Sequence, residues 1–361
     1  MIARPDGPFH LCIVGGTPTS RGGVEIFTER ANAAVALCRP DWRLTTLPAQ
    51  TAFLRPARFP GFLRALTAFG RAARRDRVDL LWLQACNLPD LVYLLLARLL
   101  RVRVLVTPHL GANSQLQRTA TLRHALRHLL GRADRLALLF DGQDREIALP
   151  PHVPRSVIRT LLPRDALRPA APMPDRGPAI RLIHAARLSD GKGSFRFIAL
   201  CVELKRRGLP FTAQLVGTAD EPTTARLRAD IAAADLGPAF TWEGWMAEAP
   251  LLEQLRATDV LVHLSVLDSY PLIVLEAMAS GALPLVTDMA GMAAMVAHGD
   301  GHVVPAEHAV TAAADWLCTQ DPVALRRRGV ALGHRVRTDY DWPACVATLA
   351  DAVALIRDRR G

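Results

Sequence analysis

Three short segments of the sequence place glycines and charged side chains directly after apolar strands. They are Gly22-Gly23-Val-Glu25, Arg187-Leu-Ser-Asp-Gly-Lys192-Gly193 and Asp268-Ser-Tyr-Pro-Leu-Ile-Val-Leu-Glu276. Glycines let a backbone approach a ligand closely, and a helix that begins beside them offers free N–H groups to a phosphate. The pattern therefore predicts binding of a phosphate-bearing ligand.

The first two segments each have a plainer alternative. Gly22 and Gly23 could simply shape a tight strand-to-helix loop, and their spacing does not match the Gly-x-Gly-x-x-Gly fingerprint of nicotinamide enzymes. Arg187 and Lys192 lie five residues apart across a glycine turn, so both could hold one diphosphate, the arginine as a fork and the lysine as a mobile charge. A solvated basic loop would have the same composition.

The third segment combines a helix start with two carboxylates. Pro271 suits a first helical turn and Ser269 suits its cap, so the backbone N–H groups around Tyr270 and Leu272 should face outward as a phosphate seat. Two carboxylate side chains of this segment could bind hydroxyl groups of the same ligand.

Those side chains are Asp268 and Glu276. Glu276 could accept two hydrogen bonds from a ribose, and Asp268 could hold sugar hydroxyls. Alternatively, Glu276 only complements the positive end of the helix. A glutamate in so apolar a helix is costly to bury without a partner, which favours the functional interpretation.

The elements that must position these segments alternate between strands and helices on both sides of a proline-rich stretch. Strands are expected at 10–16, 78–83, 102–107, 180–185, 211–216, 240–242, 260–264 and 283–286, and helices at 24–37, 195–207, 223–234, 249–257, 271–279 and 342–357. This alternation predicts two parallel, doubly wound sheets.

The predicted domains are 1–162 (N-terminal, Rossmann-like), 163–178 (linker, five prolines in sixteen residues), 179–340 (C-terminal, Rossmann-like) and 341–361, a helix that packs back on the first domain.

Composition and charge narrow the class of protein. The 361 residues suffice for two domains, and the six cysteines show no metal-site or disulfide spacing, which favours a reducing cytoplasm. No signal-peptide core is expected at the N-terminus, and the apolar run 91–100 is too short to span a membrane. Residues 1–165 hold 24 basic against 12 acidic residues, whereas residues 166–361 hold 20 against 22.

The basic first half suggests an anionic partner. Residues 53–77 mix seven arginines with apolar side chains, and Arg118, Arg123, Arg127 and Arg132 add more. Such stretches suit docking on an anionic bilayer, and an arginine-rich solvated face fits them as well. A nucleic-acid partner is not expected, because the sequence shows no binding motif and no interleaved stacking aromatics.

Together these segments resemble the family-four retaining glycosyltransferases of the GT-B fold. The likeness covers nearly the whole chain and includes Leu215-Val-Gly217 and Gly299-Asp-Gly301-His-Val-Val304 besides the three segments. It implies an α/β fold with two Rossmann-like domains that face a cleft, and a UDP- or GDP-sugar as donor substrate. Bacterial surface-polysaccharide or lipopolysaccharide synthesis, on a saccharide or lipid-linked acceptor, is the implied setting.

The resemblance also implies residue roles. Arg187 and Lys192 would bind the diphosphate, Glu276 the ribose, and the amides after Asp268 the distal phosphate and hexose, with Gly217 in the same donor site. Gly22 and Gly23 would close over the phosphates, and His109 would lie near the transferred sugar.

No metal or cofactor is expected, because no Asp-x-Asp loop is present.

The family has a glutamate where this chain has Asp268. An inactive GT-B-like binding or structural protein is the alternative.

Overall fold

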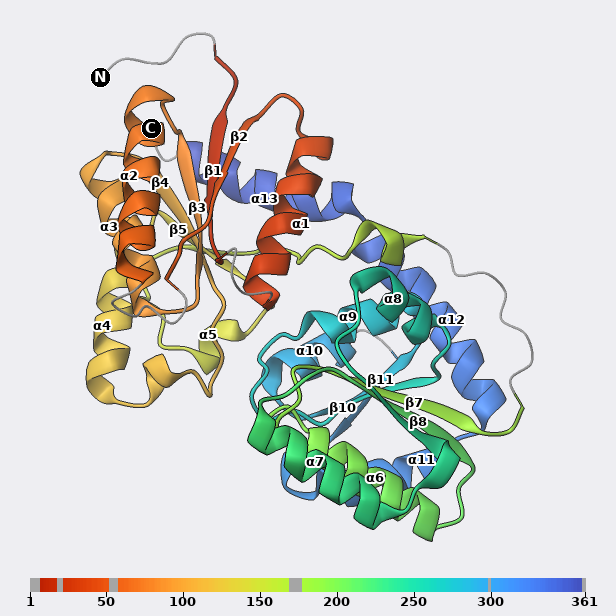
Figure 1. Cartoon of the computed structure of the whole chain (residues 1–361). Coiled ribbons are helices and arrows are strands. Elements are labelled where there is room, and N and C mark those ends of the chain that lie inside the picture. The colour runs from red at the N-terminus through yellow and green to blue at the C-terminus, as the bar shows by residue number, and fades with distance from the viewer. Residues whose placement is uncertain (1–6, 18–21, 52–57, 169–176, 298–299, 359–361) are drawn as a thin grey trace. The chain divides into compact units, whose positions relative to one another are not determined.

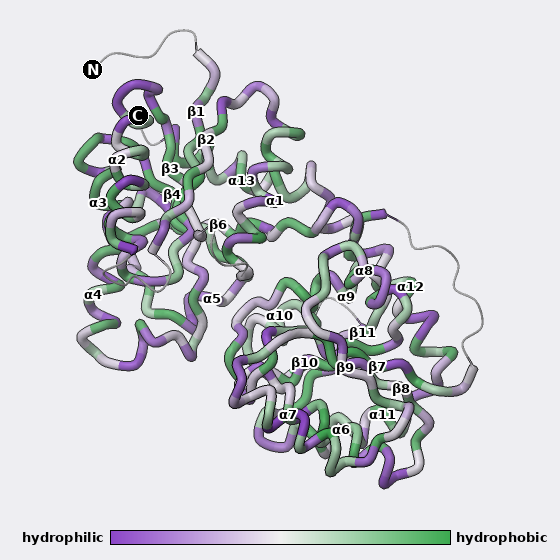
Figure 2. Tube along the Cα trace, in the orientation of Figure 1, coloured by the Kyte–Doolittle hydropathy of each residue, from purple (hydrophilic) through white to green (hydrophobic). Residues whose placement is uncertain are grey.

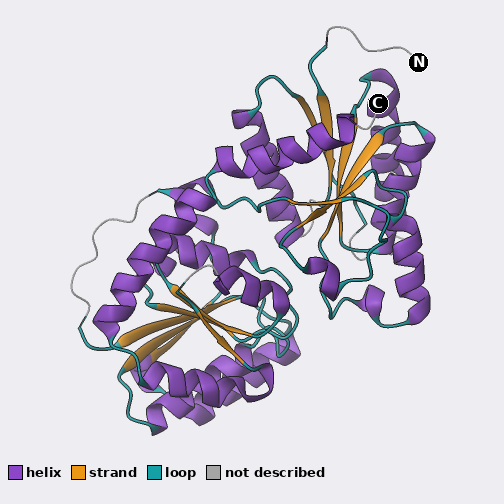
Figure 3. Ribbon diagram, turned by 180° about the vertical axis from the view of Figure 1, so that it is seen from behind, coloured by secondary structure: helices purple, strands orange, loops and turns teal. Residues whose placement is uncertain are grey.

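The computed structural model describes residues 7–17, 22–51, 58–168, 177–297 and 300–358, and it divides the chain into two compact units. Unit 1 comprises residues 1–161 and 340–361, and unit 2 comprises residues 162–339. Each unit is an α/β structure with helices on both faces of its own sheet (Figure 1, Figure 3).

The sheet of unit 1 has six parallel strands in the order β2-β1-β3-β4-β5-β6. Its elements are β1 (His10–Val14), α1 (Gly23–Cys38), β2 (Arg43–Leu47), α2 (Phe59–Arg75), β3 (Leu80–Ala85), α3 (Leu91–Leu99), β4 (Arg103–Pro108), α4 (Ala120–Leu130), β5 (Arg135–Leu138), α5 (Gln143–Glu146), β6 (Arg155–Val157) and α13 (Trp342–Arg357). Strands β1, β3 and β4 are almost wholly buried, as expected for a parallel sheet covered on both faces.

The last helix, α13, belongs to unit 1 although it follows unit 2 in the chain. It packs against α1, and its residues Trp342, Cys345, Leu349 and Ile356 are buried. The Arg103 guanidinium also donates to the Ile356 carbonyl at 2.7 Å. The prediction that the C-terminal helix returns to the N-terminal domain is confirmed.

The sheet of unit 2 also has six parallel strands, in the order β12-β11-β10-β7-β8-β9. Its elements are β7 (Ile180–Ala185), α6 (Ser194–Arg206), β8 (Phe211–Val216), α7 (Glu221–Ala234), β9 (Phe240–Glu243), α8 (Glu248–Arg256), β10 (Val260–His263), α9 (Leu272–Ser280), β11 (Leu283–Thr287), α10 (Ala290–Ala297), β12 (His302–Val304), α11 (Ala309–Cys318) and α12 (Pro322–Asp339). Figure 2 shows the hydrophobic character of the neighbouring strands β10 and β11, whose residues are all buried.

The strand order of unit 2 reverses direction between β7 and β10. From β7 the chain first builds outward through β8 and β9, and then crosses back to place β10 on the other side of β7. The loops after β7 and β10 therefore leave the same edge of the sheet and diverge, which is where open α/β sheets bind ligands.

The proline-rich linker is only partly described. Residues 164–167 form a short 3-10 turn, and Ala166 is buried, while residues 169–176 lie outside the described residues. Among the helices of the described ranges, none is both long enough and apolar enough to cross a bilayer.

Candidate functional site

The loops after β7 and β10 are joined to each other by backbone contacts. The Val266 N–H donates to the Gly191 carbonyl at 2.9 Å, and the Ser265 hydroxyl donates to the same oxygen at 3.2 Å. Ser265 in turn accepts from the N–H groups of Leu267 and Asp268, each at 3.2 Å. Two segments that lie about 75 residues apart in sequence thus form one structural unit.

Glycine is required where these loops touch. Gly193 has φ of +86°, and a Cβ there would lie 2.4 Å from the Leu264 carbonyl oxygen. At Gly217, after β8, φ is +134° and a Cβ would lie 1.9 Å from the Ala186 carbonyl oxygen. Gly217 therefore lies against the residue that precedes Arg187, where a larger side chain has no room.

Lys192, in the loop after β7, and Asp268, in the loop after β10, form an ion pair. The Lys192 ammonium binds Asp268 Oδ1, and His263 Nε2 lies 2.9 Å from Asp268 Oδ2. The Asp268 side chain is 13% exposed and that of Lys192 is 31% exposed, so the carboxylate lies inside and the ammonium lies nearer solvent.

The charge state of Asp268 follows from these partners. Burial by itself would raise the pKa of the carboxyl, but the hydrogen bond from His263 and the charge of Lys192 outweigh it and hold that pKa well below the usual range. Asp268 is therefore ionised at neutral pH.

A second buried histidine supports the loop after β7. His184 lies between its Nδ1 contact with the Val262 carbonyl at 2.9 Å and its Nε2 contact with the Ser194 hydroxyl at 3.2 Å. Because a carbonyl only accepts, Nδ1 carries the proton and Nε2 accepts from Ser194. Ser194 also accepts from the Ser189 N–H at 3.1 Å, which fixes the start of the loop.

The two histidines stack on each other. Their ring centroids are 5.8 Å apart with an interplanar angle of 19°. Burial, with a smaller effect of neighbouring His263, lowers the pKa of His184 to about 3, so this ring is neutral at pH 7. Neither histidine is identified by the sequence patterns alone.

The start of α9 differs in detail from the prediction. The helix begins at Leu272 with Pro271 itself at the N-cap position, so Ser269 lies before the cap and does not occupy it. Proline has no side-chain acceptor, and the helix has no side-chain cap. Glu276 lies in the second turn, 8% exposed.

Arg187 is exposed at the beginning of the loop after β7. At the end of β8, the Gly217 carbonyl accepts a hydrogen bond from Trp242 Nε1 at 3.1 Å. Among the site residues predicted in unit 2, the structure thus joins Lys192 to Asp268 directly and places Gly217 beside Ala186.

The remaining predicted residues, Gly22, Gly23 and His109, belong to unit 1. Gly22 is the N-cap of α1, and Gly23 is its first residue. The Glu25 carboxylate accepts from the Thr17 N–H at 3.1 Å and from the Gly22 N–H at 3.0 Å, so it closes the loop that these glycines end. Residues 18–21 of that loop lie outside the described residues.

His109 follows β4 and is held by Gln84, a residue that the sequence motifs do not reveal. Its Nε2 lies 2.9 Å from Gln84 Oε1, and its ring contacts Phe27 edge-on with centroids 5.1 Å apart. Burial lowers the pKa of His109 to about 4. The ring is therefore neutral, with Nε2–H donating to Gln84 and Nδ1 carrying a lone pair.

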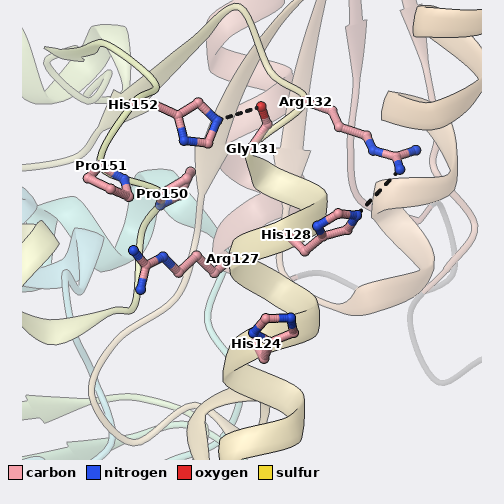
Figure 4. Close-up of a pocket in the computed structure, with 8 residues that line it drawn as sticks. All are labelled: His124, Arg127, His128, Gly131, Arg132, Pro150, Pro151 and His152. Carbon is pink, nitrogen blue, oxygen red and sulfur yellow. Dashed lines mark hydrogen bonds between the residues drawn. The ribbon is translucent and has the colours of Figure 1, made fainter.

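A separate hollow lies at the opposite, amino edge of the unit 1 sheet. It has a volume of about 440 Å³ and is lined by His124, Arg127, His128, Gly131, Arg132, Pro150, Pro151 and His152. Figure 4 shows the three residues of α4, the two that follow it, and the loop before β6. Its lining contains no acidic side chain, so it is suited to an anion rather than a cation.

Known proteins resemble the chain in sequence and in fold. Residues 174–328 match the family model described as glycosyl transferases group 1. A curated relative is the glycogen synthase of Mycobacterium tuberculosis (strain CDC 1551 / Oshkosh), 32% identical over 195 residues, which are 53% of this chain and 45% of the relative. The chain thus spans about half the length of the curated relatives that it matches.

Two solved structures cover almost all of both chains. The sucrose-phosphate synthase of Thermosynechococcus elongatus has a TM-score of 0.76 at 18% identity, covering 97% of this chain and 100% of that one. Anabaena HepE in complex with UDP-glucose has a TM-score of 0.74 at 14% identity, covering 96% and 99%. The predicted fold class, two Rossmann-like domains of the GT-B type, is confirmed.

Proposed function

We propose that this chain is a retaining hexosyltransferase, a proposal supported by the match of residues 174–328 to the family model of glycosyl transferases group 1 and by the GT-B fold. It moves a hexose from a nucleoside-diphosphate sugar to a hydroxyl of a saccharide or lipid-linked acceptor. The observation that carries this proposal is the joined pair of loops at the strand-order reversal of unit 2, with Lys192 and the start of α9 in them.

In this proposal the donor diphosphate binds at those loops. Arg187, Lys192 and the free N–H groups at the start of α9 stabilise the charge that develops on the leaving diphosphate. Glu276 accepts hydrogen bonds from the ribose hydroxyls. Gly22 and Gly23 approach the phosphates, and His109 contacts the transferred sugar.

The proposed reaction exchanges one bond for another at the anomeric carbon. The bond from that carbon to the diphosphate oxygen breaks, and a bond to the acceptor oxygen forms on the same face. The acceptor proton passes to an oxygen of the leaving diphosphate, so no protein base is required. The phosphate charge is stabilised by Arg187, Lys192 and backbone N–H groups, and we propose that turnover is independent of added metal.

A donor screen tests the first part of the proposal. Thermal unfolding is measured with UDP, GDP, UDP-glucose, UDP-galactose and GDP-mannose, because a ligand that binds only the folded protein raises Tm. We expect one base to raise Tm, with and without sugar. Absence of any shift across all five would contradict the proposal.

Variants test the assigned residues. Lys192→Ala and Glu276→Ala should each lower turnover, Lys192→Ala by about 10²- to 10³-fold, the usual effect of removing one preorganised charge stabiliser. Lys205→Ala, in which the lysine removed is exposed on α6, is the matched control. Turnover in excess EDTA should equal that without it. Unchanged turnover in Lys192→Ala would overturn the assignment.

We also propose that unit 1 docks on an anionic membrane surface from the cytoplasmic side, where a lipid-linked acceptor would be presented. Helix α2 exposes Phe59 and Leu63, 48% and 45% exposed, beside Arg64 and Arg71. The anion-suited hollow at α4 adds Arg127 and Arg132. Apolar side chains next to arginines favour an interface with anionic lipid headgroups.

Vesicle flotation tests this docking. Binding to vesicles with anionic lipid should exceed binding to neutral vesicles and should fall as salt rises, because charge attraction is screened. The double variant Arg127→Glu with Arg132→Glu should bind less, whereas Arg228→Glu on α7 should not. Salt-independent binding or no binding removes the membrane proposal.

The second candidate function, an inactive GT-B-like binding protein, predicts nucleotide-sugar binding without turnover. Hydrolysis of the bound donor in the absence of acceptor distinguishes the two, since a live transferase releases the nucleoside diphosphate slowly.

A further inference from the structure

Asp268 occupies the position where the resemblance implies a contact with the sugar, but its carboxylate is already held on both sides. Oδ1 binds the Lys192 ammonium and Oδ2 lies 2.9 Å from His263 Nε2. Its own backbone N–H is fixed by the Ser265 hydroxyl at 3.2 Å. Both the side chain and the backbone of Asp268 are thus directed inward, toward the end of β10.

His263 presents a fixed donor to this carboxylate. The His263 side chain is 2% exposed, and its Nδ1 is buried without a hydrogen-bond partner in the described part of the chain. Because an ionised carboxylate only accepts hydrogen bonds, His263 Nε2 is the donor and Asp268 Oδ2 the acceptor.

Lys192 retains the capacity to bind a phosphate in this arrangement. An ammonium has three donors, of which Asp268 takes one. The lysine is the more exposed member of the pair, so its remaining donors are available to a ligand. A long, flexible side chain that is fixed before binding loses less conformational freedom when the ligand arrives.

We propose that Asp268 acts on the donor through Lys192, as a positioning residue for the phosphate-binding ammonium, and that His263 fixes the Asp268 carboxylate for this task. The inference rests on the proposed function and refines it: Asp268 contributes to binding of the diphosphate, and not to recognition of the hexose.

Comparison of a bare nucleotide with its sugar ester tests this role. Dissociation constants are measured calorimetrically for UDP and UDP-glucose, and for GDP and GDP-mannose. In Asp268→Asn the dissociation constant of the nucleotide that binds and that of its sugar-bearing form should change by the same factor, to within about twofold. A change confined to the sugar-bearing ligand would show a hexose contact and overturn the proposal, as would no change in either.

A double-mutant cycle tests whether the effect passes through Lys192. In a Lys192→Met background, Asp268→Asn should leave the affinity for the bare nucleotide unchanged to within about twofold, because the partner it acts on is gone. An effect as large as in the unmodified chain would contradict the coupling.

The role of His263 has its own control. His263→Leu should change both affinities by a common factor, whereas His263→Gln, which can still donate to Asp268, should restore them. If His263→Gln behaves like His263→Leu while both keep the Tm of the parent, His263 does not act through this hydrogen bond.

A ligand-free measurement separates this inference from the proposed function. The chain has two lysines, Lys192 and Lys205, so ¹⁵N-lysine labelling gives two ammonium signals. The signal of Lys192 should be protected from exchange in the wild type and lost in Asp268→Asn, with Lys205 unchanged. If no nucleotide binds but this signal behaves as stated, the proposed function fails and the pairing stands. An unchanged Lys192 signal overturns the pairing itself.

Discussion

Gln84 is the only uncharged polar side chain in β3, whose other residues are Leu, Trp and Ala. It is fully buried, and its Oε1 is the acceptor for His109 Nε2 at 2.9 Å, while its Nε2 has no partner among the described residues. Burying a polar side chain in such a position costs folding free energy, and the hydrogen bond that Gln84 makes here is the one that holds the His109 ring.

We therefore expect Gln84→Leu to lower turnover by releasing the His109 ring from its fixed orientation. The His109 N–H would lose its acceptor, which should also reduce the free energy of unfolding by about 1–3 kcal/mol. Gln115→Leu, at an exposed position of unit 1, is the control. Turnover assays and urea unfolding measure both effects. Parent-like turnover in Gln84→Leu would remove His109 orientation from the mechanism.

At the scale of elements, the loop after β7 depends on how closely it packs against the end of β10. Gly193 and Gly208 both have positive φ, +86° and +73°, but of the two only Gly193 has backbone atoms within 4 Å of the place that a Cβ would take. Alanine substitutions at the two glycines therefore separate the free-energy cost of a left-handed backbone from the cost of a steric clash with neighbouring backbone atoms.

Gly208→Ala should lower the free energy of unfolding by about 1–2 kcal/mol, the cost of a left-handed residue with a side chain. Gly193→Ala should lower it by about 1–3 kcal/mol more, since the Leu264 backbone must also move. Gly193→Ala should further weaken donor binding, because the joined loops shift. Equal unfolding midpoints for the two variants in urea would contradict the close packing.

Helix α13 offers a similar comparison within one element. Leu349 is 1% exposed and Leu355 is 48% exposed. Leu349→Ala should destabilise unit 1 by about 2–5 kcal/mol, as expected for a buried leucine, while Leu355→Ala should have little effect. Hydrogen exchange followed by mass spectrometry should locate the lost protection in residues 7–161, with residues 177–339 unchanged. Loss of protection in unit 2 alone would contradict the assignment of α13 to unit 1.

At the scale of the whole molecule, each unit contains a histidine that is buried in its neutral form. The pKa is about 4 for His109 in unit 1 and about 3 for His184 in unit 2, both below the ordinary value of 6.5. The unfolded chain therefore binds more protons than the folded chain between these values, so stability falls as the pH drops below about 6.5.

For His184 alone, lowering the pH from 7 to 5 should reduce the free energy of unfolding by about 2 kcal/mol. Urea unfolding at the two pH values measures the change. In His184→Gln this pH dependence should be weaker, whereas in His334→Gln, which alters an exposed histidine of α12, it should match the parent. Equal slopes in all three proteins would contradict a neutral, buried His184.

The sequence by itself determined most of the strands and about half of the helices, together with the charged segments that follow β7 and β10. Strands 180–185 and 211–216 and helix 342–357 were predicted with the bounds observed, because each is an apolar run with clear breakers at its ends. Strands β2, β5, β6 and β12 were not predicted, since β5, β6 and β12 span only three or four residues and β2 has no buried residue. The cap of α9 was placed two residues too early.

Only the tertiary structure decided which polar groups meet. Lys192 and Asp268 were assigned to different parts of the donor, yet they bind each other across 76 residues of sequence. His184 and His263 look like isolated polar residues in apolar strands, and they become neighbours because β10 is inserted next to β7. Strand order is a long-range property of the sheet, set by how the crossovers pack, and local residue patterns do not contain it.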